Sequence, residues 1–245
     1  MTILKDLIAS LPDDAAVRSV LVGAHWTAVC SHYCGLASTV AGDRPHDQNR
    51  VRDVGRLHLK SACELAEYSL SDNPLESSLG VAAINSLLDV DESHAVEVNA
   101  AEVLAERGRG KNVALVGHFP FVPKLREKLG NLWVIEQRPS PGDYPAEAAA
   151  ELIPQADVVA LTGSALINHT LDGLLALCRR GSVVMILGPS TPLSPVLFSH
   201  GATIISGARV IDEAAVLRTI GQGATFQQVA GVRLLTFFSD SKPQE

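Results

Sequence analysis

Three short segments place glycine beside imidazole or hydroxyl side chains, each directly after an apolar run that is typical of a buried strand. The segments are Gly117-His118, Thr162-Gly163-Ser164 and Gly188-Pro189-Ser190-Thr191. Imidazole titrates near neutral pH and can exchange a proton with a substrate, while hydroxyls and backbone N–H groups can bind a small polar or anionic molecule. The carboxyl ends of parallel strands meet at one edge of a sheet, where such folds bind ligands. We therefore expect the three segments to line one site.

His118 is the residue that we expect to be catalytic, because its position suits a general base. The alternative is a polar loop residue packed beneath a domain interface. Ser164 either contacts the ligand or only caps a helix that begins at Ala165, and the Gly188 segment also suits a rigid turn. Asn168 lies one helical turn beyond Ser164. The expected ligand contacts from these segments are Gly117, Thr162, Ser164, Asn168, Ser190 and Thr191.

The first of these turns departs from the pattern of a dinucleotide-binding loop. It contains Gly117 but lacks the later glycines of G-x-G-x-x-G, which allow close approach of a pyrophosphate. Glu136 nevertheless ends the next predicted strand, roughly twenty residues after Gly117, where such folds place an acid on a ribose hydroxyl. Glu136 is therefore a further candidate for ligand binding, and the alternative is a solvated strand end.

The first hundred residues offer one candidate, on a predicted helix over residues 75–88. Asn73 as N-cap, Pro74 at the first position and Glu76 as a capping-box acid mark its start. Apolar residues surround its axis, so the helix should be deeply buried. Burying an unpaired amide is costly, so Asn85 needs a polar partner, either backbone or ligand. We expect Asn85 to approach the ligand site from this part of the chain.

Strand-like and helix-like runs alternate from about Gly110 onward. Short apolar strands separated by helices predict a parallel sheet covered on both faces, with right-handed crossovers. The fold class is thus α/β with a Rossmann-like sheet, whose strand order stays open. The expected strands are 113–116, 132–136, 158–161, 183–187 and 203–206, with an edge strand at 233–238. The expected helices are 121–129, 146–153, 165–180, 194–200 and 213–220.

The preceding part of the chain has a different pattern and predicts a smaller α+β domain. An amphipathic helix over 3–11 precedes three β-like runs, at 17–22, 26–30 and 36–40. A charged loop over 43–53 and a helix over 57–70 follow, and a helix over 100–107 links the two parts. We expect one domain over residues 1–105 and a second over 110–245.

Composition limits the classes of function. The 245 residues are 47% hydrophobic and 19% charged, which is typical of a globular chain. The net charge is −7 and the basic residues are scattered, so the chain lacks the concentrated positive charge that binding to nucleic acid or anionic lipid needs. The uncharged run 181–208 is long enough to raise the question of a membrane span, but its three prolines favour strand, loop and helix. We expect a cytoplasmic protein whose four cysteines are thiols.

His25, Cys30, His32 and Cys34 invite a metal interpretation, since thiolate and imidazole suit soft ions. The expected hairpin at residues 31–34 would break the continuous strand that such a site needs. We therefore predict no metal ligands here, and interpret these residues as thiols and imidazoles at a hairpin tip.

Several segments taken together resemble a prokaryotic family described as putative heavy-metal chelation proteins. The matching segments are 80–85 (GVAAIN), 116–120 (VGHFP), 156–159 (ADVV), 162–170 (TGSALINHT) and 187–192 (LGPSTP). The resemblance implies an enolase-amino-terminal-like domain joined to a Rossmann-like domain, with a site between them. It also implies a role in making, altering or handling a metal-chelating small molecule.

Three functions remain open on this basis. The leading hypothesis is an enzyme that condenses or hydrolyses a chelator precursor in an interdomain cleft. The second is a non-catalytic binder of a metal chelate or its precursor, and the third a metal-binding protein that uses the Cys/His hairpin. The expected partner is a small polar metabolite or metal chelate. The cofactor stays unknown, and a homodimer stays an open alternative.

Overall fold

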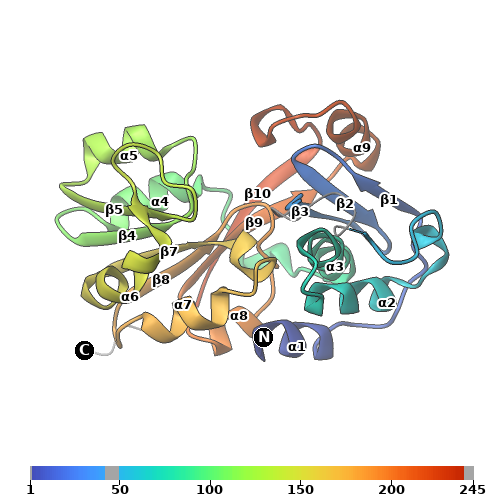
Figure 1. The fold of residues 1–245 in the computed structure, drawn as a ribbon, viewed down its shortest axis with the longest axis horizontal. Helices are drawn as coiled ribbons and strands as arrows, with labels where there is room; N and C mark the ends of the chain where they lie inside the picture. Colours follow the sequence, from blue (N-terminus) through green and yellow to red (C-terminus); the bar gives the residue numbers. More distant parts are fainter. Residues whose placement is uncertain (1, 42–49, 240–245) are drawn as a thin grey trace.

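A computed structural model describes residues 2–41 and 50–239, which form a small antiparallel sheet beside a large, mostly parallel one (Figure 1). The small sheet has the order β1-β2-β3, formed by β1 (Ser19–Val22), β2 (Trp26–Cys30) and β3 (Cys34–Ser38). Helix α3 (Pro74–Leu87) packs directly on it: a Cβ added at Gly35 of β3 would lie 2.2 Å from the Ala82 carbonyl oxygen. The glycine thus permits this close contact.

The large sheet has seven strands in the order β10-β9-β8-β7-β4-β5-β6. Only β10 is antiparallel to its neighbour, and the expected parallel pairing of residues 113–116 with 158–161 is confirmed. The strand order, which the sequence left open, reverses between β4 and β7, and ligands of open α/β sheets bind at such a reversal. The strands are β4 (Asn112–Val116), β5 (Asn131–Glu136), β6 (Tyr144–Pro145), β7 (Val158–Thr162), β8 (Val183–Leu187), β9 (Ile204–Val210) and β10 (Val232–Phe238).

Helices cover both faces of the large sheet (Figure 1). On one face, α4 (Ala100–Arg107) and α5 (Val122–Lys128) pack through apolar side chains such as Leu104 and Leu125. On the other face, a single apolar cluster includes the large sheet and helices α1, α2, α3, α7 and α8. The two sheets therefore share one core, and the expected division at residues 105–110 stays a prediction. The remaining helices are α1 (Thr2–Ala9), α2 (Ala62–Ala66), α6 (Ala149–Leu152), α7 (Leu171–Leu177), α8 (Val196–Ser199) and α9 (Glu213–Gly221).

Two expected helices are interrupted. The helix expected over 57–70 is divided into a 3₁₀ helix, η2 (Leu57–Leu59), the α-helix α2, and a second 3₁₀ helix, η3 (Glu67–Leu70). The division occurs because Ser61 starts α2 with its own capping box. The helix expected over 165–180 is divided into η7 (Gly163–Leu166) and α7, since His169 adopts a left-handed φ of 59°. The expected loop over 43–53 lies mostly outside the described residues.

The uncharged run 181–208 folds as a strand, a short helix and a strand of the large sheet, as its prolines indicated. In the part of the chain that the structure describes, no helix combines the length and the apolar character that a membrane crossing needs.

Candidate functional site

A cavity of about 1040 Å³ opens at the carboxyl ends of β4, β7 and β8, where the strand order reverses. The small sheet contributes to its wall through β2 and β3, so the cavity lies between the two sheets. All three glycine-containing segments line it, as the topology of parallel strands required. The predicted site residues that line this cavity are Gly117, His118, Glu136, Thr162, Ser164, Asn168 and Ser190.

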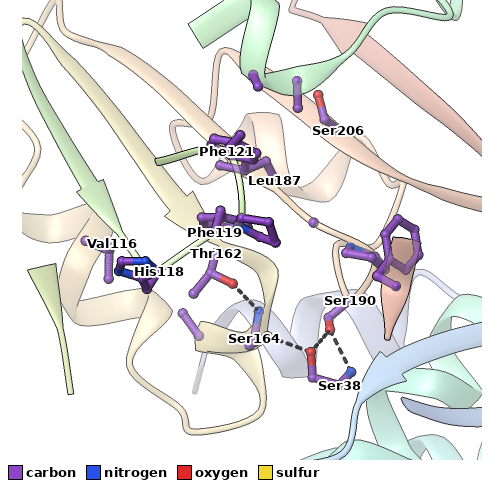
Figure 2. A pocket seen from close by; sticks show the side chains of 18 of the residues that line it. Ser38, Val116, His118, Phe119, Phe121, Thr162, Ser164, Leu187, Ser190 and Ser206 are labelled. Atoms are coloured by element: carbon purple, nitrogen blue, oxygen red, sulfur yellow. Dashed lines mark hydrogen bonds between the residues drawn. The ribbon is translucent and has the colours of Figure 1, made fainter. Parts of the chain in front are cut away.

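Three serine hydroxyls form a continuous chain in the wall (Figure 2). Ser38 Oγ, at the end of β3, lies 3.0 Å from Ser164 Oγ and 3.1 Å from Ser190 Oγ, and the Ser38 N–H donates to Ser190 Oγ over 2.8 Å. Two contacts among three hydroxyls use two of the three hydrogens. One of the three hydroxyls therefore retains a hydrogen that these two contacts do not use and that it can donate to a ligand.

Ser164 does not cap a helix, contrary to one of the two interpretations of this residue. Thr162 is the N-cap of η7, because its Oγ1 accepts from the Ser164 N–H at 3.3 Å. The Ser164 hydroxyl points instead to Ser38 on the other sheet (Figure 2). The cap at Thr162 thus leaves the hydroxyl of Ser164 for the cavity wall.

His118 forms a charged group with Asp143 and Arg126, and the three residues lie on two loops and helix α5 beside the large sheet. Its Nδ1 lies 2.7 Å from Asp143 Oδ2, and Arg126 donates to Asp143 Oδ1 over 2.8 Å. The Asp143 side chain is completely buried, whereas that of His118 is 39% exposed. With Asp143 ionised, Nδ1 carries the proton of the neutral ring, and Nε2 is left with an unshared electron pair. A carboxylate that orients an imidazole in this way suits a general base or a metal-ligand histidine.

The environment of Asp143 favours its ionised form. Burial alone raises the pKa of this carboxyl, but hydrogen bonds from His118 and the Ser140 N–H, with the charges of His118 and Arg126, outweigh that effect. The net pKa lies below the ordinary value of 3.8. Asp143 is therefore a carboxylate at neutral pH, able to hold the His118 ring in one orientation.

The Glu136 carboxylate holds the turn that carries His118. Its Oε2 accepts from the His118 N–H at 2.8 Å and its Oε1 from the Gln137 N–H at 2.7 Å. The turn itself needs glycine, since Gly117 has a φ of 105° and an added Cβ would lie 3.0 Å from the Thr162 Cβ. Glu136 thus positions this loop, and its expected contact with a ligand stays a prediction.

Asn85 and Thr191 are not among the residues that line the cavity, and their expected contact with a ligand stays a prediction. Asn85 Nδ2 donates to the backbone oxygens of Leu36 and Ser190, at 2.8 Å and 3.4 Å. Thr191 packs so closely on Gly163 that a Cβ there would lie 2.6 Å from the Thr191 nitrogen. Both residues therefore support Ser190 from behind. Asn85 Oδ1 and Thr191 Oγ1 are buried without a hydrogen-bond partner.

Glu76 is not a capping-box acid, although Asn73 caps α3 as expected. The Glu76 side chain is almost fully buried, and it accepts from the Arg52 N–H, Arg52 Nε and Ser71 Oγ. A carboxylate with these partners is satisfied away from the helix terminus. Glu76 joins the start of α3 to the segment that follows residue 49.

Two sequence families that share the description "Putative heavy-metal chelation" match residues 4–88 and 99–238, nearly the whole chain. The chain belongs to this putative heavy-metal chelation family. An uncharacterised protein from Methanocaldococcus jannaschii is 33% identical over 187 residues, covering 73% of this chain and 70% of that protein.

Solved structures of putative heavy-metal chelation proteins share the fold. A protein of unknown function from Desulfitobacterium hafniense is 28% identical, with a TM-score of 0.86 over 97% of this chain and 98% of that one. Another, from Pyrococcus horikoshii, is 21% identical, with a TM-score of 0.81 over 96% and 98% of the two chains. The two sheets of this chain are thus arranged as in other members of the family.

His25, Cys30, His32 and Cys34, for which a metal interpretation was considered, do not all lie together in the structure. Cys30 and Cys34 are free thiols that face each other across β2 and β3. The hydrogen bond to Cys34, followed by burial, raises the pKa of Cys30 well above its ordinary range, which disfavours the thiolate that binds metals. His25 lines the large cavity and His32 is exposed. Among residues 2–41 and 50–239, no three His, Cys, Asp or Glu side chains are grouped as metal ligands.

Three contributors to the candidate site were missed from the sequence. Ser38 is a polar residue inside the predicted strand over 36–40, next to apolar residues, which is a usable signal. Asp143 follows Gly142 in a turn after β5, and Arg126 lies one helix earlier. Nothing in their local patterns distinguishes these two charges from ordinary surface residues.

Proposed function

We propose that the protein binds a small polar metabolite in the cavity between the two sheets and moves a proton on it with His118. The observation that carries this proposal is the pairing of His118 Nδ1 with the buried Asp143 carboxylate at 2.7 Å, in a ring that lines the cavity. Nε2 is then the proton acceptor. The hydroxyl chain of Ser38, Ser164 and Ser190 binds polar atoms of the same molecule.

The reaction class that fits these groups is condensation or hydrolysis of a precursor of a metal chelator. Both reactions need a group that removes a proton from a nucleophile and returns it to a leaving group, and a neutral imidazole does both near neutral pH. The description of the family supports the choice of metabolite, and the His118–Asp143 pair supports the choice of acid–base chemistry.

A non-catalytic binder of a metal chelate is the second candidate. The same observation favours it, since a histidine whose Nδ1 is held by a carboxylate presents Nε2 to a metal ion. In this case the ion belongs to the bound chelate and is cargo. His118 would then occupy a free coordination position of that ion.

Native mass spectrometry of protein purified without added ligand tests both candidates. A retained metabolite is identified, added back, and followed by chromatography for conversion by wild type, His118→Gln and the exposed control His94→Gln. The enzyme hypothesis expects conversion that only His118→Gln slows, by about 100-fold or more. An intact metallated chelate released unchanged would favour the binder. A retained molecule that His118→Gln converts as fast and binds as tightly as wild type would contradict both.

A further inference from the structure

Aromatic side chains are scarce in this chain, and they gather at the cavity. The sequence has two Trp, three Tyr and six Phe, and four of these rings line the cavity: Trp26, Phe119, Phe121 and Phe226. Within the described residues, Tyr68 is the only aromatic side chain of the fully buried core, which is otherwise aliphatic. Aromatic rings are therefore nearly absent from the buried core and are concentrated in the wall of the cavity.

These four rings form two contacting pairs from distant parts of the chain. Phe119 and Phe121, in the loop before α5, stack with centroids 4.9 Å apart and planes 11° apart. Trp26 of β2 and Phe226 of η8 (Phe226–Gln228) have centroids 5.2 Å apart and planes tilted by 57°. All four rings are half-buried, so each keeps surface that another ring could cover. Aromatic rings prefer such offset or edge-to-face partners beyond the area that they bury.

Two of the four aromatic residues, Phe119 and Phe121, lie beside the part of the cavity wall that carries the serine hydroxyls (Figure 2). The figure shows Phe119 and Phe121 next to Leu187, on one side of Thr162 and the three serine hydroxyls. The hydroxyl chain retains one hydrogen for an acceptor, as derived above. A molecule that satisfied both surfaces would present a flat apolar face to the rings and an oxygen or nitrogen lone pair to the serines.

We propose that the ligand is a flat, unsaturated ring system that carries a hydrogen-bond acceptor at its edge. This inference rests on the proposed function, because it names the class of metabolite for the same cavity. The volume of about 1040 Å³ accommodates fused rings with substituents, since pockets for drug-sized molecules range from about 300 to 1000 Å³. An aliphatic metabolite would cover the ring surface that these pairs leave free without adding the aromatic contact that this surface favours.

Two probes that differ only in flatness test the proposal. Naphthalene-2-carboxylate and its saturated analogue decahydronaphthalene-2-carboxylate carry the same acceptor, and binding is measured by saturation-transfer difference NMR. Quenching of Trp26 fluorescence gives a second readout in a Trp133→Phe background, which leaves Trp26 as the remaining tryptophan. Wild type should bind the flat probe about three- to tenfold more tightly than the saturated one.

Variants locate this preference in the cavity. Phe226→Leu and Phe119→Leu keep apolar volume but remove a ring, so each should weaken binding of the flat probe by about three- to tenfold. The control Phe238→Leu removes a ring outside the cavity and should change nothing. Equal affinity for the two probes, no binding of the flat probe, or equal effects of Phe226→Leu and Phe238→Leu would overturn the proposal. A retained natural ligand that is aliphatic but depends on His118 would overturn this inference and leave the proposed function standing.

Discussion

The hydroxyl chain and the His118 group line the same cavity but are held in opposite ways. The chain joins Ser38 of the small sheet to Ser164 and Ser190 of the large one, and Ser190 is 1% exposed. The His118 group lies on two loops and helix α5, all beside the large sheet, and its imidazole is 39% exposed. The hydroxyl chain is thus part of the contact between the two sheets, whereas the His118 group takes no part in that contact. Substitutions in the first should cost stability, and those in the second should cost chemistry.

Gly163→Ala should have the largest effect on stability, because the added Cβ would clash with the backbone of Thr191, next to Ser190 of the hydroxyl chain. The new Cβ would lie 2.6 Å from the Thr191 nitrogen and 2.9 Å from its Cα, and backbone atoms cannot move aside cheaply. We expect a loss of about 3 kcal/mol or more in the free energy of unfolding, measured by urea denaturation.

Gly173→Ala is the matched control for that substitution. Gly173 lies on the exposed side of α7, and nothing lies within 4 Å of its added Cβ. Alanine should stabilise the helix by about 0.5 to 1 kcal/mol. Equal effects of the two substitutions would show that the region around Gly163 is not tightly packed.

Asn85→Ala should have the next largest effect, although Asn85 touches no cavity surface. It removes the donor to the Leu36 and Ser190 carbonyls and leaves both oxygens with one partner fewer. We expect a loss of about 1 to 3 kcal/mol in the free energy of unfolding. Ligand affinity should also fall, since Ser190 loses its support. An unchanged urea midpoint would contradict the comparison at this point.

Asp143→Asn lies on the other side of the comparison and should produce a smaller, pH-dependent loss. The pKa of Asp143 lies below its ordinary value of 3.8 in the folded protein, so the ionised carboxylate favours folding. That contribution is complete above the ordinary value and is lost as the pH falls through the lower, folded value. Wild type should exceed the variant by about 1 to 2 kcal/mol at pH 6 to 7.

Urea denaturation of both proteins at pH 7 and pH 3 checks the sign of this dependence. The difference between wild type and Asp143→Asn should shrink at the lower pH, because the carboxyl of the unfolded chain, with its ordinary pKa of 3.8, is then mostly protonated and part of the stabilisation by the ionised form is lost. A difference that grew on acidification would show that Asp143 is not ionised in the folded protein.

His118→Ala should have the smallest effect on stability and the clearest effect on function. The half-exposed imidazole can be replaced by water, and Asp143 keeps its bonds to Arg126 and the Ser140 N–H. The free energy of unfolding should change by less than about 0.5 kcal/mol. Affinity for the retained ligand should fall by about tenfold. A variant that unfolds but binds normally per folded molecule would place the site elsewhere.

The sequence predicted the strands of the large sheet except β6, because each of the others is a short apolar run that ends at glycine or a polar residue. The two exposed residues of β6 give no such signal. It also predicted that the turns after β4, β7 and β8 meet, since this follows from parallel strands alone. It did not predict the break at His169, where a left-handed φ occurs without glycine or proline. The hydrogen bond that His169 Nε2 donates to the Ser69 carbonyl oxygen, at 2.8 Å, couples that loop to a residue 100 positions away.

The candidate site could be predicted only as far as local patterns reach. Ser38 lies 126 positions from Ser164, and no periodicity links residues of the two sheets. Asp143 lies 25 positions beyond His118, in a turn whose placement depends on β5, β6 and Arg126 together. Asn85 is not among the residues that line the cavity, and a helix that is apolar all round does not indicate which of its neighbours faces a ligand.

The position of α1 has a consequence for synthesis of the chain. Its buried side chains Ile3, Leu4 and Leu7 pack against α7 and α8, and the Thr2 N–H donates to Asp172 Oδ1 at 2.7 Å. Translation proceeds at about 5 to 20 residues per second, so α7 and α8 emerge roughly 10 to 40 seconds after α1. During that interval the apolar side chains of α1 lack these two partners, although η3 (Glu67–Leu70), which also contacts α1, is made earlier. The side chains that later pack on α7 and α8 are then accessible to a chaperone that binds nascent chains.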